Sequence, residues 1–244
     1  MLQVKELTGG YTRIPAISNI SFSMLPGQFY AVVGLNGAGK STLLHHLTAT
    51  MSAFSGEVEL DGVTPTTPQA YKQKIAYVPE TPILYDELTL KEHVELVARV
   101  YQVPFDETLE KAMHYARLFR LDNRLEWFPS AFSKGMKQKV MLILALMLDV
   151  PLYIIDEPFM GLDPIAIKDL LNIFQDKLND NAMIIVSTHI LSQIHRDIDK
   201  VLFMHKGQLI EEKTVSTLLE DYQCTTVDDL FIAMVSKQQG AENG

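Results

Sequence analysis

Short apolar segments of strand length alternate with segments of helical period along the chain, and this alternation predicts an α/β fold. Buried strands are predicted at five places, which are residues 28–33, 75–78, 152–155, 183–186 and 201–204. The segment from Glu57 to Leu60 alternates and ends at Asp61-Gly62, which predicts a hairpin turn. The last of the five strands should turn back at residues 205–208 into Leu209-Ile210.

Between residues 88 and 148 the pattern changes to a helical period, which predicts a helical insertion of about 60 residues within the α/β core. Thr89 should cap the first helix, because Glu92 three residues later completes a capping box. A third helix should run from about Lys137 to Leu148. A capped helix is also predicted at the C-terminal end, with Thr226 as its N-cap and Asp229 at its third position.

Composition narrows the possible partners. The chain has 244 residues, one large domain by length, with 21 Lys and Arg against 30 Asp and Glu, hence a net charge of −9. Such an acidic chain without a basic run is expected to bind no nucleic acid. A single cysteine, Cys224, excludes an internal disulfide framework and fits a reducing cytoplasm. The longest apolar run, 140–148, is about half of a membrane span, so no direct membrane insertion is expected.

Residues 34–42, GLNGAGKST, match the phosphate-binding loop pattern G-x-x-x-x-G-K-[ST]. A chance match is expected in roughly 1% of chains of this length, and here the motif also follows a predicted strand and opens a predicted helix. Glycines let backbone N–H groups close around phosphate oxygens, while Lys40 reaches the β and γ phosphates and Ser41 offers a hydroxyl to Mg²⁺. The predicted nucleotide-binding residues here are Gly34, Asn36, Gly37, Ala38, Gly39, Lys40, Ser41 and Thr42.

Two adjacent carboxylates, Asp156 and Glu157, follow the apolar strand 152–155. Ligands of open α/β sheets bind at the C-terminal ends of the strands, which is where these carboxylates should lie. We predict that Asp156 holds Mg²⁺ through water, and that Glu157 orients or deprotonates an attacking water. Two solvated acids at a strand end are common by themselves, but after a phosphate-binding loop the catalytic interpretation is favoured.

These two motifs and four others in the right order resemble the ATP-binding-cassette (ABC) ATPases over nearly the whole chain. Residues 132–136, Phe-Ser-Lys-Gly-Met, stand where the family has its signature, usually LSGGQ. Glu80 stands at the Q-loop, residues 161–163 look like the D-loop, and His189 looks like the switch histidine. Tyr11 is placed like the aromatic residue that stacks on adenine.

The resemblance implies a P-loop NTPase (RecA-like) core with an antiparallel β subdomain and an inserted helical subdomain. It implies one ATP-binding domain at residues 1–220, with the α/β core at 1–82 and 150–220, the helical subdomain at 83–149, and a C-terminal helix and tail at 221–244. The implied cofactors are ATP and Mg²⁺. The implied catalytic residues are Glu157, His189 and Glu80, the further nucleotide-binding residues are Tyr11, Ser133, Gly135 and Asp163, and the metal-binding residues are Ser41, Asp156 and Glu80.

Three residues depart from the family pattern. Lys134 replaces the first glycine of the signature pair and Met136 replaces its glutamine. A lysine cannot adopt a positive φ cheaply, but it adds a positive charge that can face a phosphate. With Lys137 and Lys139 it forms either a solvated basic face or a docking point for a nucleotide held by another subunit. Glu80 replaces the glutamine of the Q-loop, and its carboxylate can still approach Mg²⁺ while adding negative charge near the phosphates.

Segments 77–82, 132–139 and 153–159 look like those of the Ecs-type bacterial ATP-binding subunits, which resemble exporter ATPases and pair with a separate multi-span membrane protein. The resemblance therefore implies an ATP-hydrolysing subunit of an exporter-type transporter. It would be cytoplasmic, peripheral on the cytoplasmic face of the cell membrane, and would form a head-to-tail homodimer with ATP. The helical subdomain would offer its groove to helices of the membrane permease.

The alternative is a soluble single-cassette ABC ATPase with a non-transport role such as cluster assembly. DNA-repair members carry long coiled coils, whereas this sequence has no sustained heptad. Translation-type members carry two cassettes, whereas this chain has one phosphate-binding loop. A small-molecule kinase would not explain residues 133–136 or His189.

Overall fold

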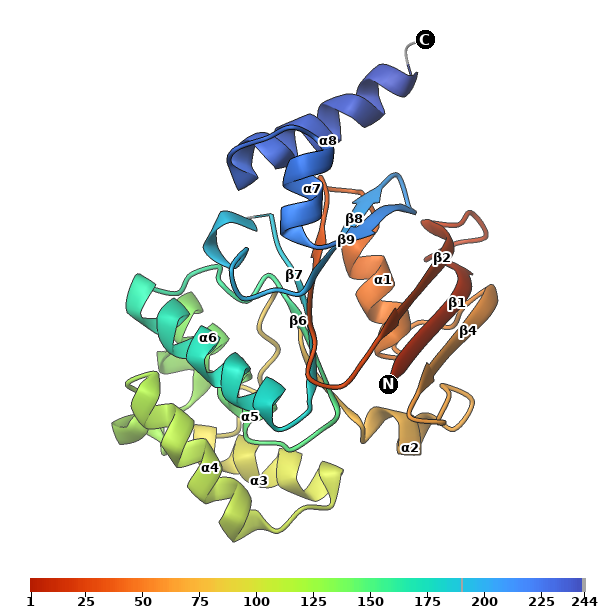
Figure 1. Ribbon diagram of the computed structural model, residues 1–244. Coiled ribbons are helices and arrows are strands. Elements are labelled where there is room, and N and C mark those ends of the chain that lie inside the picture. Colours follow the sequence, from red (N-terminus) through yellow and green to blue (C-terminus); the bar gives the residue numbers. More distant parts are fainter. Residues whose placement is uncertain (190, 243–244) are drawn as a thin grey trace.

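The computed structural model describes residues 1–189 and 191–242, and it contains two β-sheets with helices around them (Figure 1). The larger sheet has the strand order β5-β6-β7-β3-β8-β9, and its strands are parallel except the last. These strands are β3 (Phe29–Val33), β5 (Ile75–Val78), β6 (Leu152–Asp156), β7 (Met183–Ser187), β8 (Lys200–His205) and β9 (Gln208–Lys213). The smaller sheet is antiparallel, in the order β2 (Ile17–Met24), β1 (Leu2–Gly9) and β4 (Ser55–Leu60). The predicted α/β core with an antiparallel β subdomain is therefore confirmed.

Neighbouring residues of the central strands belong to two different hydrophobic cores. In β3, Phe29, Ala31 and Val33 pack with helices on one face of the sheet. Tyr30 and Val32 pack on the other face, with α1 (Lys40–Leu47) and the smaller sheet. Because both faces of the large sheet are covered, every position of β3 and β6 is buried, which explains why the sequence shows continuous apolar runs there.

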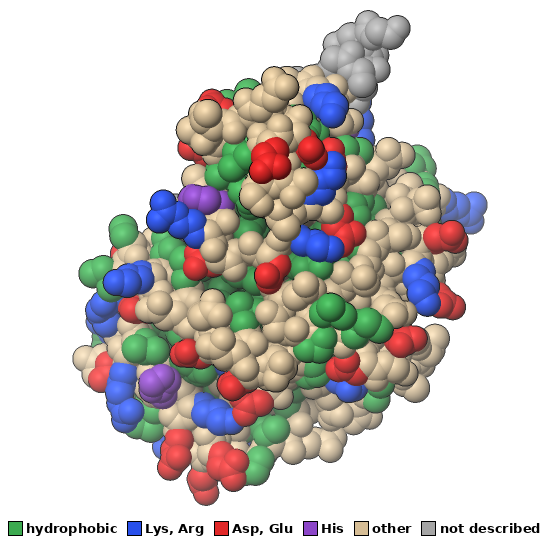
Figure 2. All heavy atoms as spheres, in the orientation of Figure 1, with side chains coloured by type: hydrophobic (Ala, Val, Ile, Leu, Met, Phe, Trp, Pro, Cys, Tyr) green, Lys and Arg blue, Asp and Glu red, His purple; other side chains and the backbone are tan. Residues whose placement is uncertain are grey.

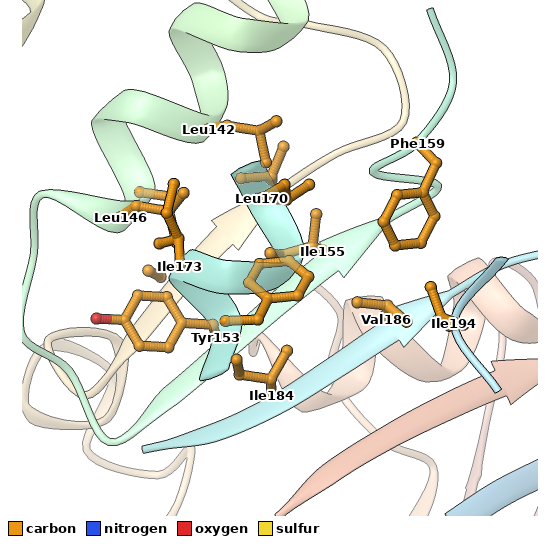
Figure 3. Packing of buried hydrophobic residues seen from close by; sticks show 14 of the residues in the cluster. Leu142, Leu146, Tyr153, Ile155, Phe159, Leu170, Ile173, Ile184, Val186 and Ile194 are labelled. Carbon is orange, nitrogen blue, oxygen red and sulfur yellow. The ribbon is translucent and has the colours of Figure 1, made fainter. Parts of the chain in front are cut away.

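The helical insertion contains α3 (Leu90–Tyr101), α4 (Phe105–Leu118) and α5 (Lys134–Leu146), and the short 3₁₀ turns η1 (Asp122–Arg124) and η2 (Pro129–Ala131) lie between α4 and α5. Figure 3 shows how α5 joins this insertion to the sheet, with Leu142 and Leu146 packed beside Tyr153 and Ile155 of β6. The helix α6 (Pro164–Asn179) completes this layer through Leu170 and Ile173. The insertion therefore shares the main core of the protein.

Within the helical insertion, the predicted start of the first helix is confirmed and that of the third is corrected. Thr89 Oγ1 accepts the N–H of Glu92, and the Glu92 carboxylate accepts the N–H of Thr89 at 2.7 Å, so the capping box is confirmed. The third helix begins at Lys134 rather than near Lys137. The helix begins earlier in the sequence than predicted because Ser133 is the N-cap, with its Oγ accepting the N–H of Met136.

The predicted turn at Asp61-Gly62 forms, but it does not join two paired strands. Leu60 and Val63 exchange two backbone hydrogen bonds around Asp61-Gly62, whose φ angles are +47° and +76°. The chain then leaves the sheet for α2 (Pro68–Lys72), and β4 pairs with β1 instead. Pro65 follows the turn and has no N–H to donate to a second strand.

Two helices end the chain, α7 (Val215–Asp221) and α8 (Val227–Glu242), and they lie together on one side of the sheet (Figure 1). Thr226 Oγ1 accepts the N–H of Asp229 and donates to its carboxylate, so the predicted cap is confirmed. Val227, Leu230 and Met234 anchor α8 in the main core. No helix within the described residues is long and apolar enough to cross a membrane. On the face shown in Figure 2, acidic and basic side chains are interspersed.

The capping box at α3 gives a first prediction. Replacing Thr89 with alanine should lower the free energy of unfolding by about 1 kcal/mol, because the N–H of Glu92 loses its acceptor at the buried start of a helix. Urea denaturation followed by circular dichroism measures this change. The variant Thr89→Ser keeps a hydroxyl at the cap and should retain most of the stability. Equal losses in both variants would mean that the methyl group, rather than the cap, carries the contribution.

Candidate functional site

A cavity of 980 Å³ opens where the parallel strands of the large sheet end, and it is called the central cavity below. Parallel strands place their C-terminal ends at one edge, so loops far apart in the sequence meet there. The loop after β3, Glu80 after β5, the end of β6 and His189 after β7 all line it. Of the predicted site residues it brings together Gly34, Asn36, Gly37, Gly39, Lys40, Ser41, Thr42, Glu80, Asp156, Glu157 and His189.

The phosphate-binding loop depends on its glycine residues. Gly37 and Gly39 have φ angles of +80° and +103°, which favour glycine, and a Cβ on Gly39 would lie 2.9 Å from the Ile17 side chain. The helix α1 begins at Lys40, so its N-terminal N–H groups point to the cavity. The Lys40 Nζ donates to the carbonyl of Gly34 at 3.0 Å. The positive end of α1 and the ammonium group of Lys40 together form an anion-binding site. Ala38 of the loop is buried and does not line the cavity.

The two carboxylates at the end of β6 are held differently. Asp156 is buried and accepts a hydrogen bond from the Ser187 hydroxyl. Glu157 has a φ of +50°, an uncommon value for a residue with a side chain, and this places it at the cavity rather than along the strand. Its Oε2 lies 2.9 Å from Nδ1 of His189. Two of the three predicted catalytic residues, Glu157 and His189, therefore contact one another directly.

The oxygen donors in the cavity suit Mg²⁺. The Ser41 hydroxyl and the Asp156 and Glu80 carboxylates, the three predicted metal-binding groups, all line it. Hard oxygen donors of this kind are what Mg²⁺ prefers, and the ion usually keeps water and phosphate oxygens in its shell. Within the described residues there is no cluster of three or more His, Cys, Asp or Glu side chains that could hold a metal by itself. The residues present thus fit an ion that binds together with a triphosphate.

The signature residues lie outside the central cavity. Ser133 is exposed at the N-terminus of α5, with its Oγ accepting the N–H of Met136, so its own O–H is free to donate elsewhere. Lys134 is the first residue of the helix and has no positive φ. The cost expected for a lysine at this glycine position therefore does not arise. Gly135 is different, because a Cβ there would lie 2.6 Å from the carbonyl oxygen of Gly161.

Asp163 caps α6 and pairs with the signature helix. Its carboxylate accepts the N–H groups of Ile165 and Ala166 and lies 3.2 Å from the Lys139 Nζ. The Ala166 hydrogen bond first, and then Lys139, hold the pKa of Asp163 below its usual value. Lys139 is only 14% exposed, so this lysine is not part of a solvated basic face. Lys134 and Asp163, at the starts of α5 and α6, remain exposed.

Tyr11 lies beside the cavity rather than in its lining. Its hydroxyl is 3.0 Å from Nδ1 of His45 in α1, and its ring meets the imidazole edge-on. His45 in turn contacts the ring of Tyr77 in β5, whose pKa is raised by burial. Tyr11 is thereby attached to the helix that follows the phosphate-binding loop, while most of its ring is exposed.

Sequence reasoning missed two groups at this site. Ser187 contacts the carboxylate of Asp156 and the backbone N–H of Glu157, but a serine at the end of a strand gives no signal of such a role. Phe231 of α8 lines the central cavity together with Met160. An apolar residue on a helix is normally assigned to the core, and the packing of α8 against the core and the segment η3 (Leu191–Gln193) brings Phe231 to the cavity.

Comparisons with known proteins agree on one family. The family model for the ABC transporter matches residues 17–160. The ABC-type transporter ATP-binding protein EcsA of Bacillus subtilis (strain 168) is 44% identical, over 99% of each chain. The SkfA peptide export ATP-binding protein SkfE of the same organism is 32% identical, over 87% of this chain and 88% of its own. Among solved structures, an ATP-binding subunit of an ABC transporter superposes with a TM-score of 0.91 and 40% identity, covering 96% of this chain and 99% of that one.

A more distant solved structure shows the same fold. It is a dimeric post-hydrolysis state of the cassette MJ0796 bound to ADP and phosphate. Its TM-score is 0.80 at 22% identity, over 88% of this chain and 99% of that chain.

Phe231 gives a prediction for this site. The variant Phe231→Ala should weaken nucleotide binding by about fivefold, because it opens an apolar wall of the cavity to water and so weakens the charge contacts inside. Calorimetry with a non-hydrolysable ATP analogue and Mg²⁺ measures the affinity. Ile232→Ala is the matched control, since Ile232 is the next residue of α8 and is 63% exposed. If both variants bind the analogue equally well, Phe231 has no role in the site.

Proposed function

The chain belongs to the ABC transporter family as an ATP-binding and ATP-hydrolysing subunit, and from this we propose which of its residues bind the nucleotide, hydrolyse it and contact partners. The observation that carries the proposal is the single cavity that gathers the phosphate-binding loop, both carboxylates and His189. A non-transport role such as cluster assembly is not favoured, because the curated relatives reported above are named for transport or export.

Binding of the triphosphate is assigned to the loop and to α1. The N-terminus of α1 and the Lys40 ammonium would contact the β and γ phosphates, replacing the carbonyl contact that Lys40 makes with Gly34. Tyr11 would stack on the adenine, with His45 holding its hydroxyl. Mg²⁺ would be held by Ser41, Asp156 and Glu80, and when bound it neutralises charge on the phosphates.

Hydrolysis is assigned to Glu157 and His189. The Glu157 carboxylate would orient the attacking water and accept its proton. Nδ1 of His189 contacts Oε2 of Glu157 and fixes the direction of that carboxylate, while Nε2 of the same ring is left for an oxygen of the γ-phosphate. Because Glu157 lies on a backbone of positive φ, its side chain is directed by local geometry as well as by this contact.

A second copy of the chain is the proposed partner that completes each site. The phosphate-binding loop covers one side of the triphosphate and leaves the γ-phosphate open. The exposed N-terminus of α5, with the Ser133 hydroxyl and the Gly135 N–H, has the charge to meet that phosphate, but it lies outside the cavity of its own chain. A head-to-tail homodimer would bring it to the cavity of the partner chain and would expel water from both sites.

The proposed second partner is a multi-span membrane permease, with the chain peripheral on the cytoplasmic face of the membrane. Exposed apolar side chains of Ile83, Tyr85, Trp127 and Phe128 would receive a cytoplasmic helix of that permease. The N–H of Tyr85 donates to Nε2 of His93, and the carbonyl of Trp127 accepts the N–H of Leu90, so both segments are held at the start of α3. Glu80 lies five residues before Tyr85, which links this surface to the central cavity. A relative named for peptide export supports export as the direction.

The shared site gives a prediction about assembly. In Glu157→Gln, hydrolysis should be slow while Asp156 is retained, so saturating Mg-ATP should convert the monomer to a dimer of twice the mass in light scattering. Adding Ser133→Arg should prevent the conversion, because a bulky side chain would occupy the place of the γ-phosphate. The shared-site mechanism is wrong if Glu157→Gln stays monomeric with ATP and permease present, or if the double variant dimerises equally well.

The apolar surface at the start of α3 gives a prediction about the membrane. Tyr85→Asp should reduce the share of the chain that sediments with membranes of its native host by about tenfold, because the contact would bury an unpaired charge. Val100→Asp is the control, since Val100 is 61% exposed near the other end of the same helix. Both variants should hydrolyse ATP in the absence of membranes. Equal sedimentation of the two variants would contradict the proposed docking surface.

A further inference from the structure

Ser187 lies between the carboxylate of Asp156 and the backbone N–H of Glu157. It is the last residue of β7, it is fully buried, and in the parallel register it lies opposite Asp156, the last residue of β6. A small polar residue at a fully buried position needs hydrogen-bond partners, and here both partners belong to the residues assigned to metal and water. No sequence motif assigned a role to this serine.

The hydrogen bonds of Ser187 have a defined direction. Its Oγ accepts the N–H of Glu157 at 3.0 Å, and its backbone carbonyl accepts the same N–H at 3.2 Å. Its hydroxyl then has one proton to donate, and the acceptor is Oδ1 of Asp156. The order of donation is therefore from the Glu157 backbone to the serine oxygen, and from the serine proton to the Asp156 carboxylate.

We propose that Ser187 is a positioning residue for ATP hydrolysis, which holds Asp156 toward the metal and Glu157 toward the water at the same time. The proposal rests on the roles assigned to these two carboxylates above. Donation to Oδ1 fixes the rotation of the Asp156 side chain and leaves Oδ2 for the ion and its water shell. The two bonds to the Glu157 N–H hold a backbone of positive φ, from which the catalytic side chain projects.

The effects of Ser187 on Asp156 and on Glu157 are linked, because the same hydroxyl group makes both hydrogen bonds. An apolar residue at position 187 would leave a buried carboxylate oxygen without this donor and the Glu157 N–H with only the carbonyl as acceptor. A serine that merely stabilises the core would instead affect stability alone. The dependence of nucleotide affinity on Mg²⁺, together with kcat, therefore distinguishes a positioning serine from one that only stabilises the core.

The test compares Ser187→Ala with Thr108→Val. Thr108 of α4 is also buried, and its hydroxyl donates one hydrogen bond to the carbonyl of Pro104, the N-cap of that helix, away from the cavity. Affinity for a non-hydrolysable ATP analogue is measured by calorimetry with Mg²⁺ and with EDTA. In Ser187→Ala the gain in affinity that Mg²⁺ provides should fall about tenfold while the affinity in EDTA is unchanged, and kcat should fall about tenfold. Thr108→Val should change neither quantity.

Two further variants keep the result interpretable. Ser187→Cys retains a side chain of similar size and a weak hydrogen-bond donor, so its Mg²⁺-dependent gain in affinity and its kcat should lie between those of wild type and Ser187→Ala. This variant replaces Ser187→Ala in the test if the alanine variant does not fold. In combination with Glu157→Gln, Ser187→Ala should reduce kcat by less than it does alone, because part of the effect of the serine is to position the Glu157 carboxylate, which the other change has already removed.

The outcomes separate this inference from the proposed function. Full turnover in Glu157→Gln would contradict the catalytic assignment itself. If Glu157→Gln loses turnover while Ser187→Ala behaves as Thr108→Val does, the inference about Ser187 alone is overturned. It is also overturned if Ser187→Ala weakens binding equally in Mg²⁺ and in EDTA, or if its effect on kcat is additive with that of Glu157→Gln.

Discussion

The parallel pairing of β3, β5, β6 and β7 is the constraint on which the site depends. Because these strands run in the same direction, their backbone hydrogen bonds set the distance between Asp156 and Ser187 and bring both to the edge where α1 begins. Such a sheet is stable only when both faces are covered, and here the two hydrophobic cores cover them. The packing far from the cavity therefore fixes the positions of the polar groups within it.

Much of this arrangement could be predicted because the large sheet and the phosphate-binding loop leave strong patterns in the sequence. The strand β1 leaves only a weak pattern in the sequence, because Glu6 has a φ of +48° and the pairing of β1 with β2 and β4 shifts register around this residue. Its alternation of buried and exposed residues is interrupted at that point. The helix α6 could have been assigned from Asp163 and Pro164, which are a favourable N-cap and a favourable first residue.

The residues that sequence reasoning missed at the site share one property, which is that tertiary packing rather than a local pattern brings them there. Phe231 reaches the central cavity only because Val227, Leu230 and Met234 dock α8 on the core. The same limit applies to the signature. A lysine at position 134 conflicts with a glycine pattern, yet the helix begins at that residue and accepts any side chain there, whereas Gly135 is required by the nearby Gly161 carbonyl.

The close approach of Gly135 to Gly161, together with the Lys139–Asp163 ion pair, connects the start of α5 directly to the segment that leads into α6. Glu157 lies four residues before Gly161 on the same loop. In a head-to-tail pair, a force applied to the start of α5 by the phosphate of the neighbouring subunit would therefore reach the chain's own catalytic loop within one short segment. Thermodynamic linkage then requires reciprocity, so that the free energy by which one bound nucleotide favours the second equals the free energy by which the second favours the first.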